Sequence, residues 1–222
     1  MPSWNIHTAH VERLLRQEGA PALGVRDPNA FLVGNFVPDV YVGYMVPVTT
    51  CRIDYKMTHL AGREQIPLPR HDLFWELYVE DQGVVSDVTL GAWAHLVADH
   101  VYNAHTRAYL RRRGIAPGEA ARVGKQSDFA LFGRTLKIGM RAYVDDALLA
   151  SCKDFPQYSI AEPDVRAAVE VADRIVDDNR VHQVTGDLTY RLLTAEFFES
   201  AREETNATIR DGLRAYAAGL AG

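Results

Sequence analysis

Residues 87–113 read DVTLGAWAHLVADHVYNAHTRAYLRRR, a stretch without proline that ends in three arginines followed by Gly114. Cations in a last turn and a glycine just beyond it are typical of a helix C-terminus. The first half of the stretch is largely apolar, with a few polar side chains set into it. The stretch therefore predicts one long helix.

Five further segments have the spacing or composition of helices: residues 11–19, 73–78, 129–150, 164–179 and 188–220. Pro163 is well placed for the first turn of the helix that follows it. Residues 31–48 are rich in Val, Tyr and Phe, and they fit either a β-hairpin or a buried loop with a short helix. We predict an all-α fold, a single-domain multi-helix bundle.

The size and composition of the chain set limits on its class. With 222 residues, 47% of them hydrophobic, it can bury the core of one domain without disulfides. Cys51 and Cys152 match no zinc or redox spacing, so they are predicted to be reduced structural thiols. The 24 basic and 29 acidic residues give a net charge of -5, which argues against a surface for duplex nucleic acid.

The hydropathy pattern contains no membrane or export signal. The longest apolar runs, such as residues 31–33 and 147–150, fall far short of the ~18 residues that a transmembrane helix needs. The first ten residues contain no Lys or Arg and no apolar core of the kind found in secretory signals. We therefore expect a soluble, cytoplasmic protein; its oligomeric state is not readable from the sequence.

The strongest local indication of chemistry is the pair His95 and Asp99. Residues four apart on a helix lie on one face, so these two side chains can share one divalent metal ion. A metal would also compensate a carboxylate buried on an apolar helix. Taken alone, however, an ordinary hydrogen bond between the two explains the pair better.

Three more residues carry metal-ligand chemistry earlier in the chain. His7 ends the stretch of residues 4–7 that leads into the first predicted helix, so it can point inward from the first turn. Asp39 follows proline inside an apolar stretch, where it is either a turn cap or a ligand. His59 precedes a proline-flanked linker and is, taken alone, best explained as a loop histidine.

As an ordered set, these fragments resemble the zinc-dependent phospholipase C family. That family shows an early W/I-x-H element, then L-G-x-x-x-P-D, then T-H before a proline turn, and a helical G-x-x-x-H-L-x-x-D. The corresponding residues here are 4–7, 32–39, 58–59 and 91–99. The similarity covers roughly residues 1–136 and is greatest to small bacterial metal-dependent hydrolases of the family.

The resemblance implies an all-helical fold with divalent metal ions, usually zinc, at the base of a cleft. Asp39, His59, His95 and Asp99 would bind one ion, and Asp99 would bridge to a second ion held by His7. It implies a hydrolase of phosphoric esters, acting on a small phosphate ester or a phospholipid headgroup, with Asp39 as catalytic base. The metal site would lie in residues 1–150, and residues 151–222 would be a C-terminal helical scaffold.

Two features depart from the family. The secreted phospholipases use the amino group of an N-terminal tryptophan as a ligand, whereas Trp4 is internal and fits a core or cleft-wall position. A third metal would need a histidine six residues after the aspartate and a later H-x-x-x-E element. His105 has that spacing from Asp99, but residues 126–130, QSDFA, stand where the later element should be. We therefore expect two ions rather than three.

Four residues are candidate substrate contacts: Tyr102, Asn103, His105 and Asp128. The first two share the helix face of the metal ligands and would either line the cleft or pack within the bundle. His105 lies ~240° around the helix from Asp99, so it could join only if the helix ended or bent. Asp128 is either a substitute ligand or the N-cap of a helix that starts at residue 129.

Two other functions fit parts of the pattern. One is an HD-type or nuclease-like phosphohydrolase. Related nucleases use a similar ligand set, which leaves nucleotides open as substrates. The HD type would use the adjacent pair His71 and Asp72 with His59 or Asp99, but it leaves Asp39 and the pair of His95 and Asp99 unused. A non-catalytic, metal-stabilised binding module would have a closed ion with four protein ligands, whereas an open coordination position favours catalysis.

Overall fold

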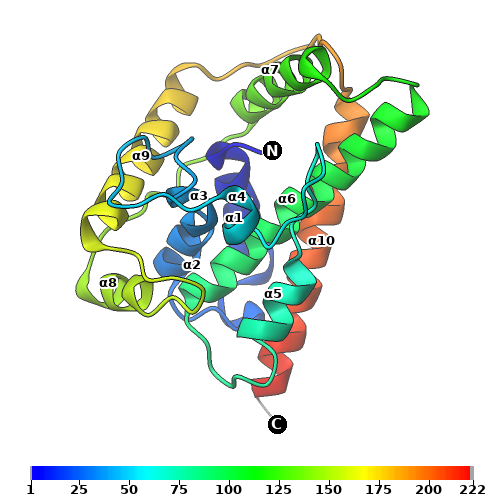
Figure 1. Cartoon of the computed structure of the whole chain (residues 1–222). Coiled ribbons are helices and arrows are strands. Elements are labelled where there is room, and N and C mark those ends of the chain that lie inside the picture. Colours follow the sequence, from blue (N-terminus) through cyan, green and yellow to red (C-terminus); the bar gives the residue numbers. More distant parts are fainter. Residues whose placement is uncertain (1, 221–222) are drawn as a thin grey trace.

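In a computed structural model that describes residues 2–220, helix α6 (Asp87–Arg112) runs through the middle of the molecule (Figure 1). Its N-terminus is capped by Ser86, whose hydroxyl accepts a hydrogen bond from the backbone of Thr89. Residues 87–99 of the helix are all buried, so it is covered on every side rather than along one face. The long helix predicted for residues 87–113 is confirmed.

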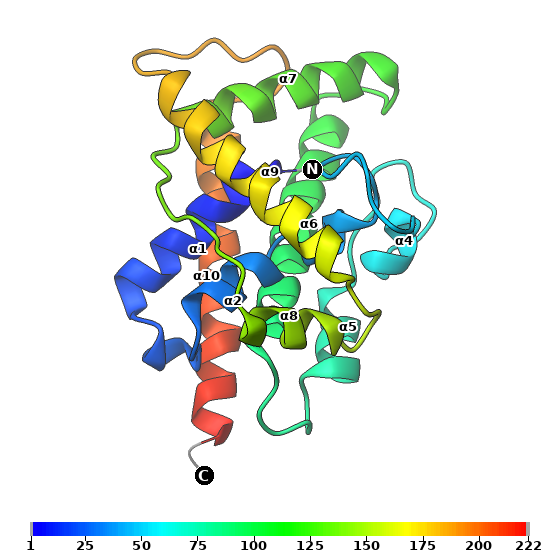
Figure 2. The ribbon, with the colours of Figure 1, turned by 90° about the vertical axis from the view of Figure 1, so that its left-hand side faces the viewer.

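The remaining helices pack around α6 and share one contiguous hydrophobic core. They are α1 (Trp4–Glu18), the 3₁₀ helix η1 (Pro21–Leu23), α2 (Pro28–Gly34), α3 (Val37–Val40), α4 (Tyr55–Thr58), α5 (His71–Tyr78), α7 (Glu119–Thr135), α8 (Asp146–Lys153), α9 (Glu162–Val181) and α10 (Ala195–Leu220). Residues 2–220 contain no strand, and the predicted all-α fold is confirmed. Helix α10 lies beside α1 and α6, while α9 crosses the outside of the bundle (Figure 2).

Two glycines bring α2 and α6 into close contact. A Cβ atom on Gly91 would stand 2.2 Å from a backbone oxygen of α2, and one on Gly34 would stand 2.3 Å from a backbone oxygen of α6. Glycine is therefore required at both positions. Because the backbones meet this closely, the carbonyl group of Asn35, just after α2, reaches the ring of His95 on α6.

The helix predicted for residues 129–150 is wrong. Helix α7 ends at Thr135, and an extended segment follows before α8 begins. Contacts from distant residues hold this segment: the carboxylate of Glu12 accepts hydrogen bonds from the backbone of residues 139 and 140, and Asn29 bonds both backbone groups of Tyr143. Apolar spacing in one segment does not reveal such contacts.

In two other segments the structure decides between, or corrects, the elements predicted from the sequence. Residues 31–48 form the end of α2, the short helix α3 and a loop, not a hairpin. Helix α10 begins at Ala195, seven residues later than predicted, after a loop.

Both cysteines are free; Cys152 is buried whereas Cys51 is exposed. Among the described helices, none is both long and apolar enough to cross a lipid bilayer.

We expect Gly91→Ala to lower the free energy of unfolding by about 2–3 kcal/mol, because the added methyl group forces α2 and α6 apart. Gly139→Ala is the matched control: a Cβ there meets nothing within 4 Å, and the change should stay within about 0.5 kcal/mol. Urea denaturation of both variants measures the difference. Equal stability of the two variants would contradict the close crossing.

Candidate metal centre

The fold gathers all five predicted metal ligands in one buried cluster. The first turn of α1 supplies His7, α3 supplies Asp39, the residue after α4 is His59, and α6 supplies the last two. The three histidines are fully buried, and the two carboxylates are at most 6% exposed. Within the cluster, two overlapping groups could each hold an ion: His7, His95 and Asp99, and Asp39, His59 and His95.

One position lies between four of these side chains. The Nε2 atoms of His59 and His95 are 3.1 Å apart, and Oδ1 of Asp39 lies 3.7 and 4.0 Å from them. Oδ2 of Asp99 lies 3.5 Å from Nε2 of His59 and 3.9 Å from Nε2 of His95. Ligand atoms around a tetrahedral zinc ion lie about 3.4 Å from one another. The separations therefore place each carboxylate within reach of an ion held by the two imidazoles.

The hydrogen bonds of the two imidazoles constrain which nitrogen of each carries the proton. Nδ1 of His95 lies 2.8 Å from the carbonyl oxygen of Asn35, which can only accept, so this nitrogen donates. Nδ1 of His59 lies 2.7 Å from the Thr58 hydroxyl, which also lies 3.2 Å from the carbonyl of Tyr55. When that hydroxyl donates to Tyr55, both neutral rings turn Nε2 lone pairs toward one another, and a shared cation would satisfy them. When it donates to His59 instead, Nε2 of His59 donates to Nε2 of His95 at 3.1 Å.

A second position lies between His7 and Asp99. Nε2 of His7 is 3.6 Å from Oδ1 of Asp99, the oxygen that does not face His59. Neither this oxygen nor either His7 nitrogen has a hydrogen-bond partner among the described residues. Buried polar atoms are rarely left without a partner, so these atoms have the character of unfilled ligands. The His7 ring stacks on that of His95, with the ring centroids 4.1 Å apart.

Burial and mutual charge shift the pKa values of the cluster. Burial lowers the pKa of His7 to about 4 and that of His59 well below its usual value, and the neighbouring His95 adds to both shifts. Burial alone would raise the pKa of Asp99, but His7, His95 and His59 outweigh it and hold this pKa below its usual range. Burial raises the pKa of Asp39. Neutral imidazoles beside an ionised carboxylate are the forms that bind metals.

Two aromatic residues orient the carboxylates. The indole nitrogen of Trp4 donates to Oδ2 of Asp39 at 3.0 Å, and the hydroxyl of Tyr55 donates to Oδ2 of Asp99 at 3.0 Å. The half-buried Tyr55 also stacks on His59, with the ring centroids 3.7 Å apart. The sequence predicts Trp4 in the core or cleft wall, and Trp4 is fully buried. Tyr55 is not evident from the sequence, where its position four residues before His59 is the one signal.

The four candidate substrate contacts lie outside this cluster or beside it. Tyr102 packs against His10 and Phe129 rather than the metal ligands. Asn103 lies one turn beyond Asp99 on α6, and its side-chain amide donates to the carbonyl of Pro67. Helix α6 continues through His105 without a bend, so this ring points away from Asp99. Its Nε2 contacts the carboxylate of Glu204 on α10 at 2.7 Å.

Asp128 is neither a substitute metal ligand nor a helix N-cap, the two roles that the sequence suggests. It lies inside α7, which begins at Glu119, so the interpretation as an N-cap is wrong. Its carboxylate accepts hydrogen bonds from three consecutive backbone N–H groups, those of residues 191–193, at 2.6–2.7 Å. The side chain therefore anchors the loop before α10. His71, of the HD-type alternative, packs edge-on against His100 outside both groups of ligands.

No protein-family model, curated protein or solved structure matches this chain. The resemblance to the zinc-dependent phospholipase C family rests on the ordered residues of the sequence alone. What the structure adds is a pair of buried His/Asp groups that could hold metal ions.

We expect the metal-free protein to lose stability as the pH falls from about 6.5 toward 4. His7, His10 and His59 take up protons near pH 6.5 when unfolded, but only at much lower pH when folded, with pKa values of about 4 and 3 for the first two. Stability then falls by about 1.4 kcal/mol per pH unit for each net proton bound on unfolding. Asp39 has a raised pKa in the folded state, so its protonation stabilises the fold as the pH falls and offsets the contribution of one of the three histidines.

Urea denaturation in the presence of a chelator, repeated across this pH range, measures the slope. His182→Gln is a suitable control, since this histidine is exposed at the end of α9 and should leave the slope unchanged. A flat or rising stability on acidification would show that the cluster histidines are not buried in the neutral form.

Proposed function

We propose that the protein is a metal-dependent hydrolase of phosphoric esters, with two divalent ions, most suitably zinc, in the His/Asp cluster. One observation carries the proposal: Asp99 turns one oxygen toward His59 and His95 and the other toward His7, where fewer protein ligands are available. A position with so few protein ligands leaves coordination places for water and substrate, which is the pattern of catalytic sites.

The donor set fits zinc. Imidazole nitrogens and carboxylate oxygens are ordinary zinc ligands, and the cluster contains no sulfur ligand. The unpartnered atoms of His7 and Asp99 are the ones that a second ion would satisfy. When bound, such a pair of ions lowers the pKa of water and stabilises the charge that develops on a phosphoryl group.

The residues of the chain divide the remaining tasks. His7, His59 and His95 hold neutral nitrogens toward the ions, with His59 and His95 fixed by Thr58 and Asn35. The carboxyl of Asp39 accepts the proton from water: burial raises its pKa toward the range where proton exchange is efficient, and Trp4 fixes its orientation.

Lys125 on α7 is a candidate contact for a negatively charged substrate. It is half-buried and lines a hollow together with Thr106 of α6, the helix that carries His95 and Asp99. Burial lowers the pKa of its ammonium group, and the carboxylate of Asp99 partly opposes this shift. We propose that Lys125 contacts the phosphate charge of the substrate. The substrate class is a small phosphate ester or a phospholipid headgroup.

One observation favours a second candidate, a non-catalytic metal-stabilised module. The imidazoles and carboxylates around the first position are almost completely buried, as the ligands of structural zinc sites are. In this case the metal contributes to folding and no ester is hydrolysed. The experiment below separates the two functions.

We expect His95→Ala to lose most of the bound zinc and at least about 100-fold of the phosphoesterase activity, because the ring serves both groups of ligands. His105→Ala is the matched control on the same helix: its ring contacts Glu204 and should leave zinc content and activity unchanged. Elemental analysis and a panel of phosphomonoesters and phosphodiesters, assayed with added zinc, manganese or magnesium, provide the measurements.

The outcomes separate the candidate functions. Zinc that is lost together with activity in His95→Ala supports the hydrolase. Zinc that is lost together with stability, in a wild-type protein inactive on every ester and metal tested, supports the metal-stabilised module. Full zinc content in His95→Ala rejects both.

We expect Tyr55→Phe to weaken zinc binding about 10-fold, because it removes the hydroxyl that orients Asp99 and leaves the stacked ring in place. Tyr44→Phe, at an 80% exposed tyrosine, is the control. Competition with a chromophoric chelator measures both affinities. An unchanged affinity in Tyr55→Phe would mean that this hydrogen bond does not position the bridging carboxylate.

A further inference from the structure

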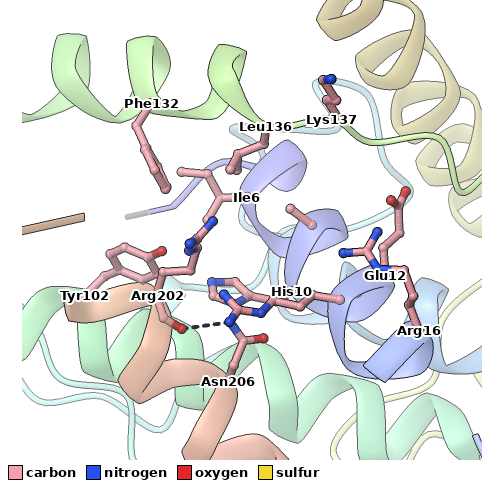
Figure 3. Close-up of a pocket in the computed structure, with 12 residues that line it drawn as sticks. Ile6, His10, Glu12, Arg16, Tyr102, Phe132, Leu136, Lys137, Arg202 and Asn206 are labelled. Carbon is pink, nitrogen blue, oxygen red and sulfur yellow. Dashed lines mark hydrogen bonds between the residues drawn. The ribbon is translucent and has the colours of Figure 1, made fainter. Parts of the chain in front are cut away.

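A separate cavity of about 260 Å³ lies between α1, α6, α10 and the end of α7 (Figure 3). Its walls include His10 from α1, Tyr102 from α6, and Arg202 and Asn206 from α10. None of the five metal ligands lines it. The cavity is therefore distinct from the metal centre, although His10 lies only three residues after His7.

Polar atoms without partners meet at this cavity. Both ring nitrogens of His10, the hydroxyl of Tyr102, Nε of Arg202 and Oδ1 of Asn206 are buried and make no hydrogen bond within the described residues. Figure 3 shows the other three side chains around the His10 ring. The amide nitrogen of Asn206 is already used by the carbonyl of Arg202. Its oxygen stands beside His10 without hydrogen-bond geometry.

The free-energy cost of burying these atoms without hydrogen-bond partners indicates that a ligand occupies the cavity. A buried donor or acceptor without a partner costs about 1–3 kcal/mol. His10 is 3% exposed and Tyr102 is fully buried, so neither side chain can reach bulk water. Burial lowers the pKa of His10 to about 3, and the neutral ring then offers one donor and one acceptor.

The charges at the cavity select the sign of the ligand. Four cationic side chains line it: Arg13, Arg16, Lys137 and Arg202. Among residues 2–220, Arg16 and Lys137 make no ion pair, whereas the other two pair with acidic residues of α10. The one acidic lining residue, Glu12, accepts hydrogen bonds from the backbone N–H groups of residues 139 and 140 and keeps its negative charge. Even with Glu12 and the paired acids Glu199 and Glu203 counted, positive side chains outnumber negative ones at the cavity.

We propose that this cavity binds a small organic anion whose phosphate or carboxylate group contacts Arg202 and the Tyr102 hydroxyl. The remaining polar atoms, on His10 and Asn206, then bind a hydroxyl or amino group of the same ligand. Arginine and tyrosine donors suit oxyanions of either kind, and Arg16 and Lys137 supply the balancing charge at the mouth. The proposal does not depend on the activity of the metal centre.

Isothermal titration of the full-length, zinc-containing protein with inorganic phosphate and with succinate tests the proposal and separates the two oxyanion classes. We expect at least one anion to bind, and Tyr102→Phe and Arg202→Gln each to weaken it at least about 10-fold. Arg166→Gln, at an exposed arginine that pairs with Glu162 on α9, is the matched control and should bind as the wild type does.

Tyr102→Phe removes a single oxygen atom, so the fold should be retained, and circular dichroism checks it. Binding of neither anion would overturn the proposal and leave ordered water as the occupant of the cavity. Binding that survives both variants would place the anion at the metal centre and would also overturn it.

Discussion

Two imidazole nitrogens face one another at 3.1 Å in the interior of this protein, and two buried carboxylates flank them. Nδ1 of His95 donates to the carbonyl of Asn35, so Nε2 of the neutral ring presents a lone pair. Burial lowers the pKa of His59 well below its usual value, which favours a neutral ring there. A divalent ion between the rings would satisfy both nitrogens and the two carboxylates.

Much of the surrounding structure holds this arrangement in place. The glycine crossing of α2 and α6 brings the carbonyl of Asn35 onto His95, and α3 follows directly with Asp39. Trp4 and Tyr55 each fix one carboxylate. The five ligands thus come from four segments of the chain, and a bound cation would offset the cost of burying their charge and lone pairs.

The sequence was informative where function and local structure coincide. The apolar stretch with its arginine-rich end defined α6, and the order of His7, Asp39, His59, His95 and Asp99 indicated one cluster before any contact was known. Properties that depend on distant partners were not predictable. Asp128 binds a loop more than sixty residues away, the segment after Thr135 is held by Glu12 and Asn29, and Tyr102 turns toward α1 and α7. No spacing rule within one segment contains that information.

If the five side chains bind two divalent ions as we propose, crystals grown with zinc should show both ions when diffraction is recorded at the zinc absorption edge. We expect one anomalous peak about 2.1 Å from Nε2 of both His59 and His95, and a second between His7 and Asp99. A well-ordered, zinc-saturated crystal without anomalous density in the cluster would rule out metal binding there.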